Sequence, residues 1–266
     1  MLLERFREAK RSEIASLRRA AERDALPAVY AGSRPDFMAA LQTAQGGTMP
    51  AVVAEYKRAS PSRGLICDAL DVEDVACQYA AAGAVALSIL TEETFFQGRL
   101  AYLERAAKKE LYKGPRLPLL RKDFLFDPLQ VRYTASTPAS ALLLIVRLTP
   151  KVEVLRALRE STEAYGMQAV VEVFDADDLR LARESGARII QVNARDLENL
   201  SVHRDACLAL ARDNPPERGE VWIAASGIRS SAHMRAAADA GFHAVLVGSV
   251  LMEGGQPAAA LSALLV

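Results

Sequence analysis

The sequence predicts a single (β/α)8 barrel, an α/β fold of eight parallel strands, preceded by an extra N-terminal helix. Eight short apolar runs, most of them rich in Val, Ile and Leu, each precede a loop and a segment of helical character. Such runs are typical of parallel strands buried on both faces, and eight alternations favour a closed barrel. No linker-like stretch divides the chain, so we expect one domain over 1–266, with a helical extension at 1–49 and the barrel at 50–266.

The eight expected strands are Ala51–Tyr56, Val85–Thr91, Leu117–Lys122, Ala141–Val146, Ala169–Phe174, Arg188–Asn193, Val221–Ser226 and Ala244–Gly248. Two short stretches that contain Pro and Gly, 113–118 and 213–219, predict turns between a helix and a strand. An open doubly wound sheet is the alternative architecture. The first strand is not followed by the GxGxxG pattern that would support it.

The first two dozen residues predict an amphipathic helix that packs on the rest of the protein. Leu3, Phe6, Ile14 and Leu17 fall near helical spacing, and charged residues surround them. A helix lying on a membrane surface is the alternative, but the charges here are of both signs. No apolar run approaches the ~20 residues that a membrane-spanning helix needs, and the charged N-terminus does not resemble a signal peptide.

Composition excludes several classes of partner and site. Lys plus Arg and Asp plus Glu both number 33, so the formal net charge is zero and nothing favours nucleic acid or a membrane surface. Cys67, Cys77 and Cys207 show no CxxC spacing and accompany no His cluster. We therefore expect a reduced, cytoplasmic protein without a disulfide framework or a zinc site.

Polar residues at the strand ends carry the functional prediction, because barrel enzymes place their chemistry there. Glu55 and Lys57 are two residues apart at the end of the first strand, so they share one face of an extended chain. Lys122 ends the third strand, where it could act as a general acid. For Glu55 and Lys57, the alternative is an exposed ion pair. For Lys122, it is a lysine that merely extends to solvent from the strand end.

Glu172 lies inside an otherwise apolar fifth strand and is the most informative single residue. A carboxylate there is costly unless it is paired or used, so a structural salt bridge inside the barrel is the alternative to a catalytic role. Asn193 and Arg195, two residues apart at the end of the sixth strand, again share one face.

Small residues follow the seventh and eighth strands, in AASGIRSS and VLVGSVLM. They allow backbone N–H groups to approach a phosphate, which in barrels of this kind usually sits at these two loops. His203, His233 and His243 are separated from one another, and we expect surface or packing roles for them. These residues together predict a metal-free enzyme that acts on a phosphorylated anion by acid–base chemistry.

The same segments resemble the indole-3-glycerol-phosphate synthase family, in family order from about residue 50 to the C-terminus, and the N-terminal helix resembles that family's extra helix. The matching segments are AEYKRASPSRGLI at 54–66, LSILTEETFFQG at 87–98, LPLLRKDFLFDPLQV at 117–131, ALLLIV at 141–146, VVEVFDADDL at 170–179, IIQVNARDLENLSV at 189–202, SGIRS at 226–230 and AVLVGSVLM at 244–252. The resemblance implies decarboxylating ring closure of 1-(2-carboxyphenylamino)-1-deoxyribulose 5-phosphate, without a cofactor, in a monomer.

The resemblance also implies roles for individual residues. Lys122 would be the general acid, Glu172 the base in the dehydration half, and Lys57 the partner of the substrate carboxylate, with Glu55 and Asn193 in support.

Substrate contacts are implied for a second set of residues. Arg195 would help to hold Glu55 and the substrate, Ser226 would contact the substrate, and Phe96, Phe124 and Leu143 would wall the anthranilate ring. The phosphate would be bound by Ser60, Gly227, Gly248 and Ser249.

The chain departs from the family pattern at two places. Ala225 stands where the family usually has a glutamate, and Glu220 cannot replace it because it lies five residues earlier on the opposite face of the strand. We therefore expect a weakened enzyme. The second departure is Pro138-Ala139-Ser140 in place of Gly-Ala-Asp, at the bottom of the barrel, where we expect an effect on stability.

Two rival functions remain open at this point. A phosphoribosylanthranilate isomerase would share the fold and the phosphate cradle, but its Cys/Asp pair is missing from the first and sixth strands. A catalytically impaired barrel that binds a phosphorylated ligand is favoured by Ala225 alone.

Overall fold

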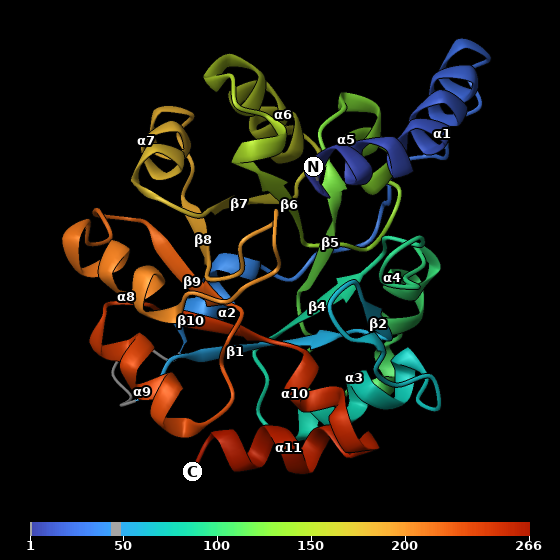
Figure 1. Ribbon diagram of the computed structural model, residues 1–266. Helices are drawn as coiled ribbons and strands as arrows, with labels where there is room; N and C mark the ends of the chain where they lie inside the picture. Colours follow the sequence, from blue (N-terminus) through green and yellow to red (C-terminus); the bar gives the residue numbers. More distant parts are fainter. Residues whose placement is uncertain (1, 44–48) are drawn as a thin grey trace.

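Eight parallel strands close into a barrel in the computed structural model, which describes residues 2–43 and 49–266 (Figure 1). The barrel strands are β1 (Ala51–Tyr56), β4 (Ala86–Leu90), β5 (Leu119–Leu125), β6 (Ala141–Ile145), β7 (Gln168–Val173), β8 (Ile189–Asn193), β9 (Val221–Ala225) and β10 (Ala244–Val247). Each strand pairs with the next in this order, and β1 also pairs with β10, which closes the ring. The predicted fold is confirmed, and the open sheet is excluded.

Helices cover the outside of the barrel. They are α3 (Val72–Ala81), α4 (Ala101–Ala106), α5 (Pro128–Thr134), α6 (Val152–Ala164), α7 (Ala176–Glu184), α8 (Arg204–Asp213), α9 (Ser231–Asp239), α10 (Ser249–Met252) and α11 (Pro257–Leu264). Short 3-10 turns occur at Lys109–Leu111, Val146–Leu148 and Glu253–Gly255, and a small hairpin, β2 (Ala59–Ser60) and β3 (Gly64–Leu65), follows β1.

Alternation along each strand divides the core into two layers. Val52 belongs to the layer between the strands and the outer helices, whereas Val53 belongs to the layer inside the barrel. Leu143 on β6 and Val170 on β7 also face the interior. Successive side chains of a strand point to opposite faces, so polar residues at inward positions are carried into the barrel.

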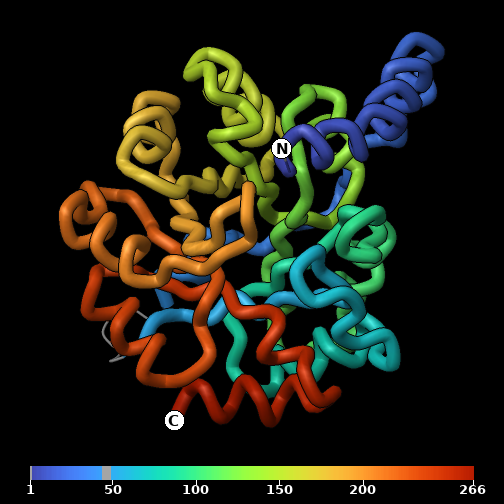
Figure 2. The backbone as a smooth tube through the Cα atoms, in the orientation of Figure 1, coloured from blue at the N-terminus to red at the C-terminus, as the bar shows by residue number. Residues whose placement is uncertain are grey.

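The N-terminal extension supplies two helices, α1 (Leu2–Glu22) and α2 (Phe37–Gln42). The first packs against α5 and β5, and the tube in Figure 2 shows it on the side of the barrel away from the C-terminal helix. Phe6, Ile14 and Leu17 of α1 are buried, as predicted. Residues 1 and 44–48 of the expected extension lie outside the described residues.

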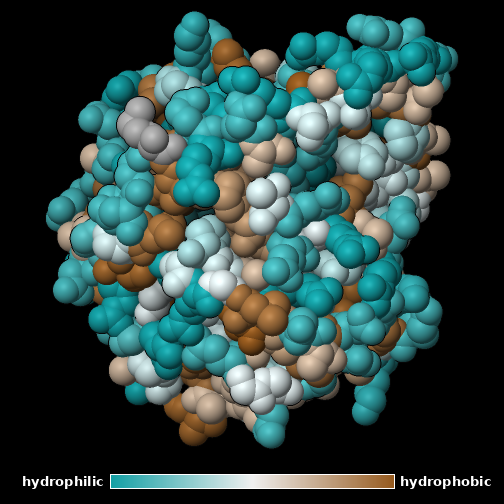
Figure 3. All heavy atoms as spheres, turned by 45° about the vertical axis from the view of Figure 1, so that its right-hand side comes forward, coloured by the Kyte–Doolittle hydropathy of each residue, from teal (hydrophilic) through white to brown (hydrophobic). Residues whose placement is uncertain are grey.

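The face of the molecule drawn in Figure 3 is mainly hydrophilic. On the face in Figure 3, hydrophobic atoms lie in small groups among polar ones. Within residues 2–43 and 49–266, no helix combines the length and the apolar character needed to cross a bilayer.

The pairing of β5 with β6 contains an irregularity that bears on the site. Between two successive pairings, β5 advances from Arg121 to Leu125 while β6 advances only from Leu142 to Leu144. Two extra residues are therefore accommodated in β5, as in a β-bulge. The sequence pattern predicts a strand that ends at Lys122, whereas β5 extends through the bulge to Leu125.

Candidate active site

One cavity of about 790 Å³ lies at the carboxyl ends of the barrel strands. It is lined by every residue that the sequence predicts for the site: Glu55, Lys57, Ser60, Phe96, Lys122, Phe124, Leu143, Glu172, Asn193, Arg195, Ser226, Gly227, Gly248 and Ser249. Residues from separate strands meet here because parallel strands all present their carboxyl ends to one rim.

A first acid–lysine pair comes from the end of β1. Lys57 Nζ lies 2.5 Å from Glu55 Oε1, and Ser88 Oγ on β4 donates to Glu55 Oε2 at 3.3 Å. The Glu55 side chain is only 1% exposed. An added Cβ at Gly248 would collide with Glu55 Oε1, so a larger residue there would displace this carboxylate.

A second acid–lysine pair joins β5 to β7. Lys122 Nζ lies 3.4 Å from Glu172 Oε2, and the Glu172 side chain is also 1% exposed. Gln191, on the neighbouring strand β8, donates a hydrogen bond from Nε2 to the same carboxylate oxygen. Glu172 is thus held from two sides, and the lysine side chain stays accessible to the cavity.

Asn193 and Arg195 contact each other, but Arg195 does not make the contact expected of it. Asn193 Oδ1 accepts from the Arg195 backbone N–H at 3.0 Å, and Arg195 Nη1 donates to the Leu200 carbonyl at 2.8 Å. Among the described residues, Glu55 forms its ion pair with Lys57 and none with Arg195. Burial, and secondarily Arg63, lowers the pKa of Arg195.

Small residues form the part of the rim predicted to hold a phosphate. Ser226 and Gly227 adopt positive φ values of 69° and 78°, so the β9–α9 loop turns sharply. Gly248 precedes the first turn of α10. Ser60 Oγ is buried and, within residues 2–43 and 49–266, has no hydrogen-bond partner. A buried hydroxyl without a partner is costly, which is consistent with a ligand oxygen binding there.

Aromatic rings form the wall on the opposite side. The Phe96 and Phe124 ring centroids lie 6.2 Å apart, and Phe124 stacks on Phe6 of α1 at 4.0 Å. The Glu92 carboxylate accepts from the backbone N–H groups of Thr94, Phe95 and Phe96 at 2.7–3.1 Å. This buried carboxylate therefore fixes the loop that carries Phe96.

Sequence reasoning missed several residues that line the cavity or contact a residue that does. Gln191 had a readable signal, since it interrupts an apolar strand as Glu172 does. Glu92 and Phe6 act through contacts that no spacing reveals. His203 and His233, which the sequence assigns to surface or packing positions, also line the cavity.

Ala225 and Glu220 lie as the sequence predicts. Ala225 lines the cavity and is 2% exposed. Glu220 instead accepts from Arg183 Nε at 3.0 Å and from Trp222 Nε1 at 2.8 Å, in the layer outside the barrel. Glu220 therefore does not supply a carboxylate to the cavity.

No candidate metal centre occurs among the residues that the structure describes, where no group of three or more His, Cys, Asp and Glu could hold an ion. The cysteines at 67, 77 and 207 are free thiols. Burial raises the pKa of Cys207 to about 12, so this thiol is not a ready nucleophile.

Solved structures of other barrels resemble this one in fold alone. A crystal structure of 3-hexulose-6-phosphate synthase aligns with a TM-score of 0.63 at 13% identity, covering 80% of this chain and 97% of that one. At this identity the likeness carries no statement about substrate.

Sequence comparisons give the family. The family model described as indole-3-glycerol phosphate synthase matches residues 3–264. An indole-3-glycerol phosphate synthase of Carboxydothermus hydrogenoformans is 41% identical over 214 residues, which are 80% of this chain and 78% of the relative. One of Rhodococcus jostii is 37% identical over 252 residues, 95% of this chain and 90% of the relative. The cavity at the strand ends and the match along almost the whole chain agree: the chain belongs to the indole-3-glycerol phosphate synthase family.

Proposed function

We propose that the protein converts 1-(2-carboxyphenylamino)-1-deoxyribulose 5-phosphate into indole-3-glycerol phosphate, carbon dioxide and water, and so acts as a carboxy-lyase in tryptophan biosynthesis. The observation that carries the proposal is the close approach of Lys122 Nζ to Glu172 Oε2, 3.4 Å, in a cavity that is also lined by Ser60. The buried Ser60 hydroxyl has no hydrogen-bond partner among the described residues. The residues proposed as acid, base and phosphate ligands thus line one cavity.

The difficult step is the attack of an aromatic carbon on the ribulose carbonyl, because that carbon is a weak nucleophile. Lys122 would donate a proton to the carbonyl oxygen as the new carbon–carbon bond forms, and a placed general acid contributes typically ~10²–10⁴-fold. The cavity would also hold the two reacting ends together, which can supply several kcal/mol.

The remaining polar residues divide the other tasks. Lys57 would bind the carboxylate that leaves as carbon dioxide, with Glu55 holding the ammonium in place at 2.5 Å. Glu172 would then remove the proton whose loss accompanies dehydration. Asn193 would support this centre, and Arg195 would bind the substrate.

Phosphate would bind between Ser60, Gly227, Gly248 and Ser249, where backbone N–H groups and small side chains leave room for it. The ring would lie against Phe96, Phe124 and Leu143. We further expect the cytoplasm as location and a monomer as working state, without cofactor; these remain predictions from the sequence.

A fluorescence assay for indole formation tests the proposal. The purified chain should produce an indole signal on addition of the substrate, and Lys122→Ala should lower kcat at least about 10²-fold. Lys151→Ala, which removes an exposed lysine at the start of α6 (Val152–Ala164), is the matched control and should leave kcat unchanged. Wild-type turnover by the Lys122 variant would contradict the assigned acid.

The same assay separates the rival functions. A barrel that only binds the ligand would give no indole signal, yet the substrate would still raise its melting temperature. An isomerase of phosphoribosylanthranilate would consume that compound instead.

A further inference from the structure

The chain segment that carries Lys122 lacks regular support on one side. The bulge between Arg121 and Leu125 interrupts the pairing of β5 with β6, so the residues within it are not held in register from that side. On the other side, Thr91, the residue directly after β4, donates a backbone hydrogen bond from its N–H to the Lys122 carbonyl at 3.1 Å. Bulges next to active sites re-aim side chains, but their orientation then needs another source of rigidity.

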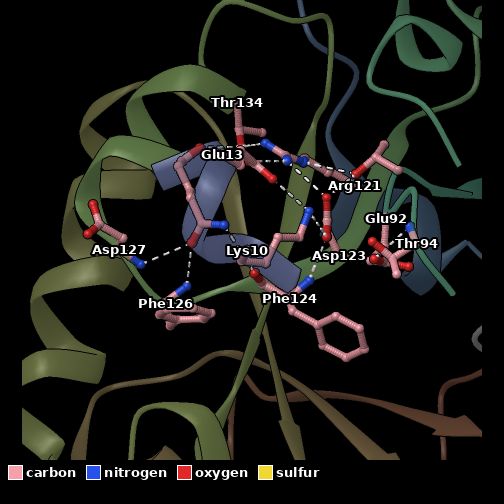
Figure 4. A network of polar contacts seen from close by, with 12 residues as sticks. Lys10, Glu13, Glu92, Thr94, Arg121, Asp123, Phe124, Phe126, Asp127 and Thr134 are labelled. Carbon is pink, nitrogen blue, oxygen red and sulfur yellow. Dashed lines mark hydrogen bonds and ion pairs between the residues drawn. The ribbon is translucent and has the colours of Figure 1, made fainter. Parts of the chain in front are cut away.

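The N-terminal helix supplies contacts at this position. Asp123 directly follows Lys122 in the chain, and Figure 4 shows its side chain facing Lys10 of α1. Lys10 Nζ lies 2.6 Å from Asp123 Oδ1, and both side chains are at most 5% exposed. Four residues earlier on α1, Phe6 stacks on Phe124 with ring centroids 4.0 Å apart. One face of α1 therefore holds the two residues that follow Lys122.

A network of charges, buried except for the partly exposed Glu13, completes the contact. Asp123 Oδ2 accepts from Arg121 Nη2 at 2.9 Å and from Thr91 Oγ1 at 2.6 Å. Glu13 Oε2 lies 2.7 Å from Lys10 Nζ, and Glu13 Oε1 lies 3.3 Å from Arg121 Nη2. The two cations and two carboxylates balance, and Asp123 Oδ1 also accepts from the Phe124 N–H at 2.8 Å.

The cost of burying three charges, with a fourth partly buried, indicates more than a stabilising role. Apolar residues of similar volume often stabilise a protein as well as a buried ion pair does, so stability alone is a weak reason for such a network. A fully satisfied polar network does, however, fix one geometry, because each partner is directional. Here the fixed geometry is that of the bulge beside the cavity.

We propose that Lys10 and Asp123 are positioning residues for Lys122: the ion pair and the Phe6–Phe124 stack let α1 hold the β5 bulge where pairing with β6 is missing. The inference rests on the proposed role of Lys122. Neither residue needs to contact the substrate, since each acts through the backbone and the neighbours of Lys122.

Four variants test this proposal by steady-state kinetics: Lys10→Met, Asp123→Asn, the double variant, and Arg11→Met as control. Arg11 lies next to Lys10, but its side chain is exposed and, among the described residues, pairs only with Glu8 on the same helix face. A misplaced catalytic group costs rate, so we expect each single variant to lower kcat about tenfold or more, with KM changed less than about threefold. Arg11→Met should stay within about twofold of the wild type.

The double variant separates positioning from independent structural effects. Residues that act through one contact are not additive, so its loss in kcat should be about that of the larger single variant and far from the product of both. The proposal would be overturned if the folded single variants had wild-type kcat, or if only KM or the melting temperature changed. It would also be overturned if the loss of kcat in the double variant equalled the product of the two single losses.

Further variants keep the test valid if a single variant does not fold. If a single variant leaves an unpaired buried charge and does not fold, the double variant and Phe6→Leu carry the test, and wild-type kcat in a folded form of either overturns the proposal. Lys122→Ala is measured first. Retained activity in that variant would contradict the proposed function, whereas loss there combined with wild-type kcat in the α1 variants would contradict this inference alone.

Discussion

Single carboxylates inside apolar strands allowed the position of the candidate active site to be predicted from the sequence. Glu55 and Glu172 are each about 1% exposed, and a charge buried to that degree requires a partner. Each has a lysine as partner, and both lysines reach the cavity. Gln191 follows the same logic at the next strand, because its amide orients Glu172, and a consistent search for polar interruptions would have found it.

Ala225 carries the prediction that belongs to this scale. Its side chain lines the cavity at the end of β9, opposite Asn193 in the strand pairing, where the family resemblance implies a glutamate. A charged hydrogen-bond partner is worth about 1.5–3 kcal/mol, so Ala225→Glu should raise kcat/KM roughly ten- to a hundred-fold. Steady-state indole fluorescence measures this.

The control for Ala225→Glu is Ala225→Gln, which adds the same volume without charge. An increase limited to the glutamate variant would assign the effect to the carboxylate. If both variants have unchanged or lower efficiency, the alanine is not a defect in this chain, and the expectation of a weakened enzyme is wrong.

The sequence predicted the barrel strands more completely than the bulge and the short hairpin that interrupt the regular pattern. All eight barrel strands begin within about two residues of their predicted starts, because apolar runs bounded by helical segments leave few alternatives. The exception at the other end is β5, which runs on to Leu125. A bulge changes register without changing hydrophobicity, so the sequence pattern does not reveal it. The β2–β3 hairpin is too short for periodicity to detect.

A stability prediction belongs to the element β6. Ser140 precedes this strand at the bottom of the barrel, and its Oγ is buried without a hydrogen-bond partner in the described part of the chain. A hydroxyl buried in this way destabilises the fold, so Ser140→Ala should raise the free energy of unfolding by roughly 1 kcal/mol. Urea unfolding measures the change, and kcat should not move because Ser140 lies far from the carboxyl ends of the strands.

Ser185→Ala is the matched control for the β6 prediction. Ser185 is equally buried, but its Oγ donates to the Ala182 carbonyl at 2.7 Å. Its replacement should lower the free energy of unfolding by about 1 kcal/mol. Equal losses in both variants would mean that the Ser140 hydroxyl is satisfied in solution.

At the scale of the molecule, α1 packs against the barrel on β5 and α5, next to the candidate active site. The sequence indicated that α1 packs on the barrel, since its apolar stripe is plain, but not where. The contact is set by Lys10 and Asp123, which lie more than a hundred residues apart in the chain. Charge pairing at such a separation cannot be read from one sequence, and the division into 1–49 and 50–266 likewise stays a prediction.

The ion pair between Lys10 of α1 and Asp123 of β5 should make the free energy of unfolding of the whole molecule sensitive to acid. Burial by itself would raise the pKa of Asp123, but the nearby Lys10 and Arg121 outweigh it and lower the pKa from its ordinary 3.8 to about 2. The folded state therefore takes up this proton less readily than the unfolded chain. The resulting stabilisation is present above about pH 4 and is lost as the pH falls through about 2.

Asp123→Asn removes the titrating group and isolates its contribution. At neutral pH the wild type should be the more stable protein, since in the variant the partly exposed Glu13 is the one carboxylate of this network that still pairs with Lys10 and Arg121. The difference in free energy of unfolding should then narrow by on the order of 2 kcal/mol as the pH is lowered, because one pKa unit corresponds to about 1.4 kcal/mol. Carboxylates outside this network titrate in both proteins and cancel in the difference. Urea unfolding of both from about pH 5 to about pH 2.5 measures it, and a difference that stays constant over this range would mean that Asp123 is not held ionised by α1.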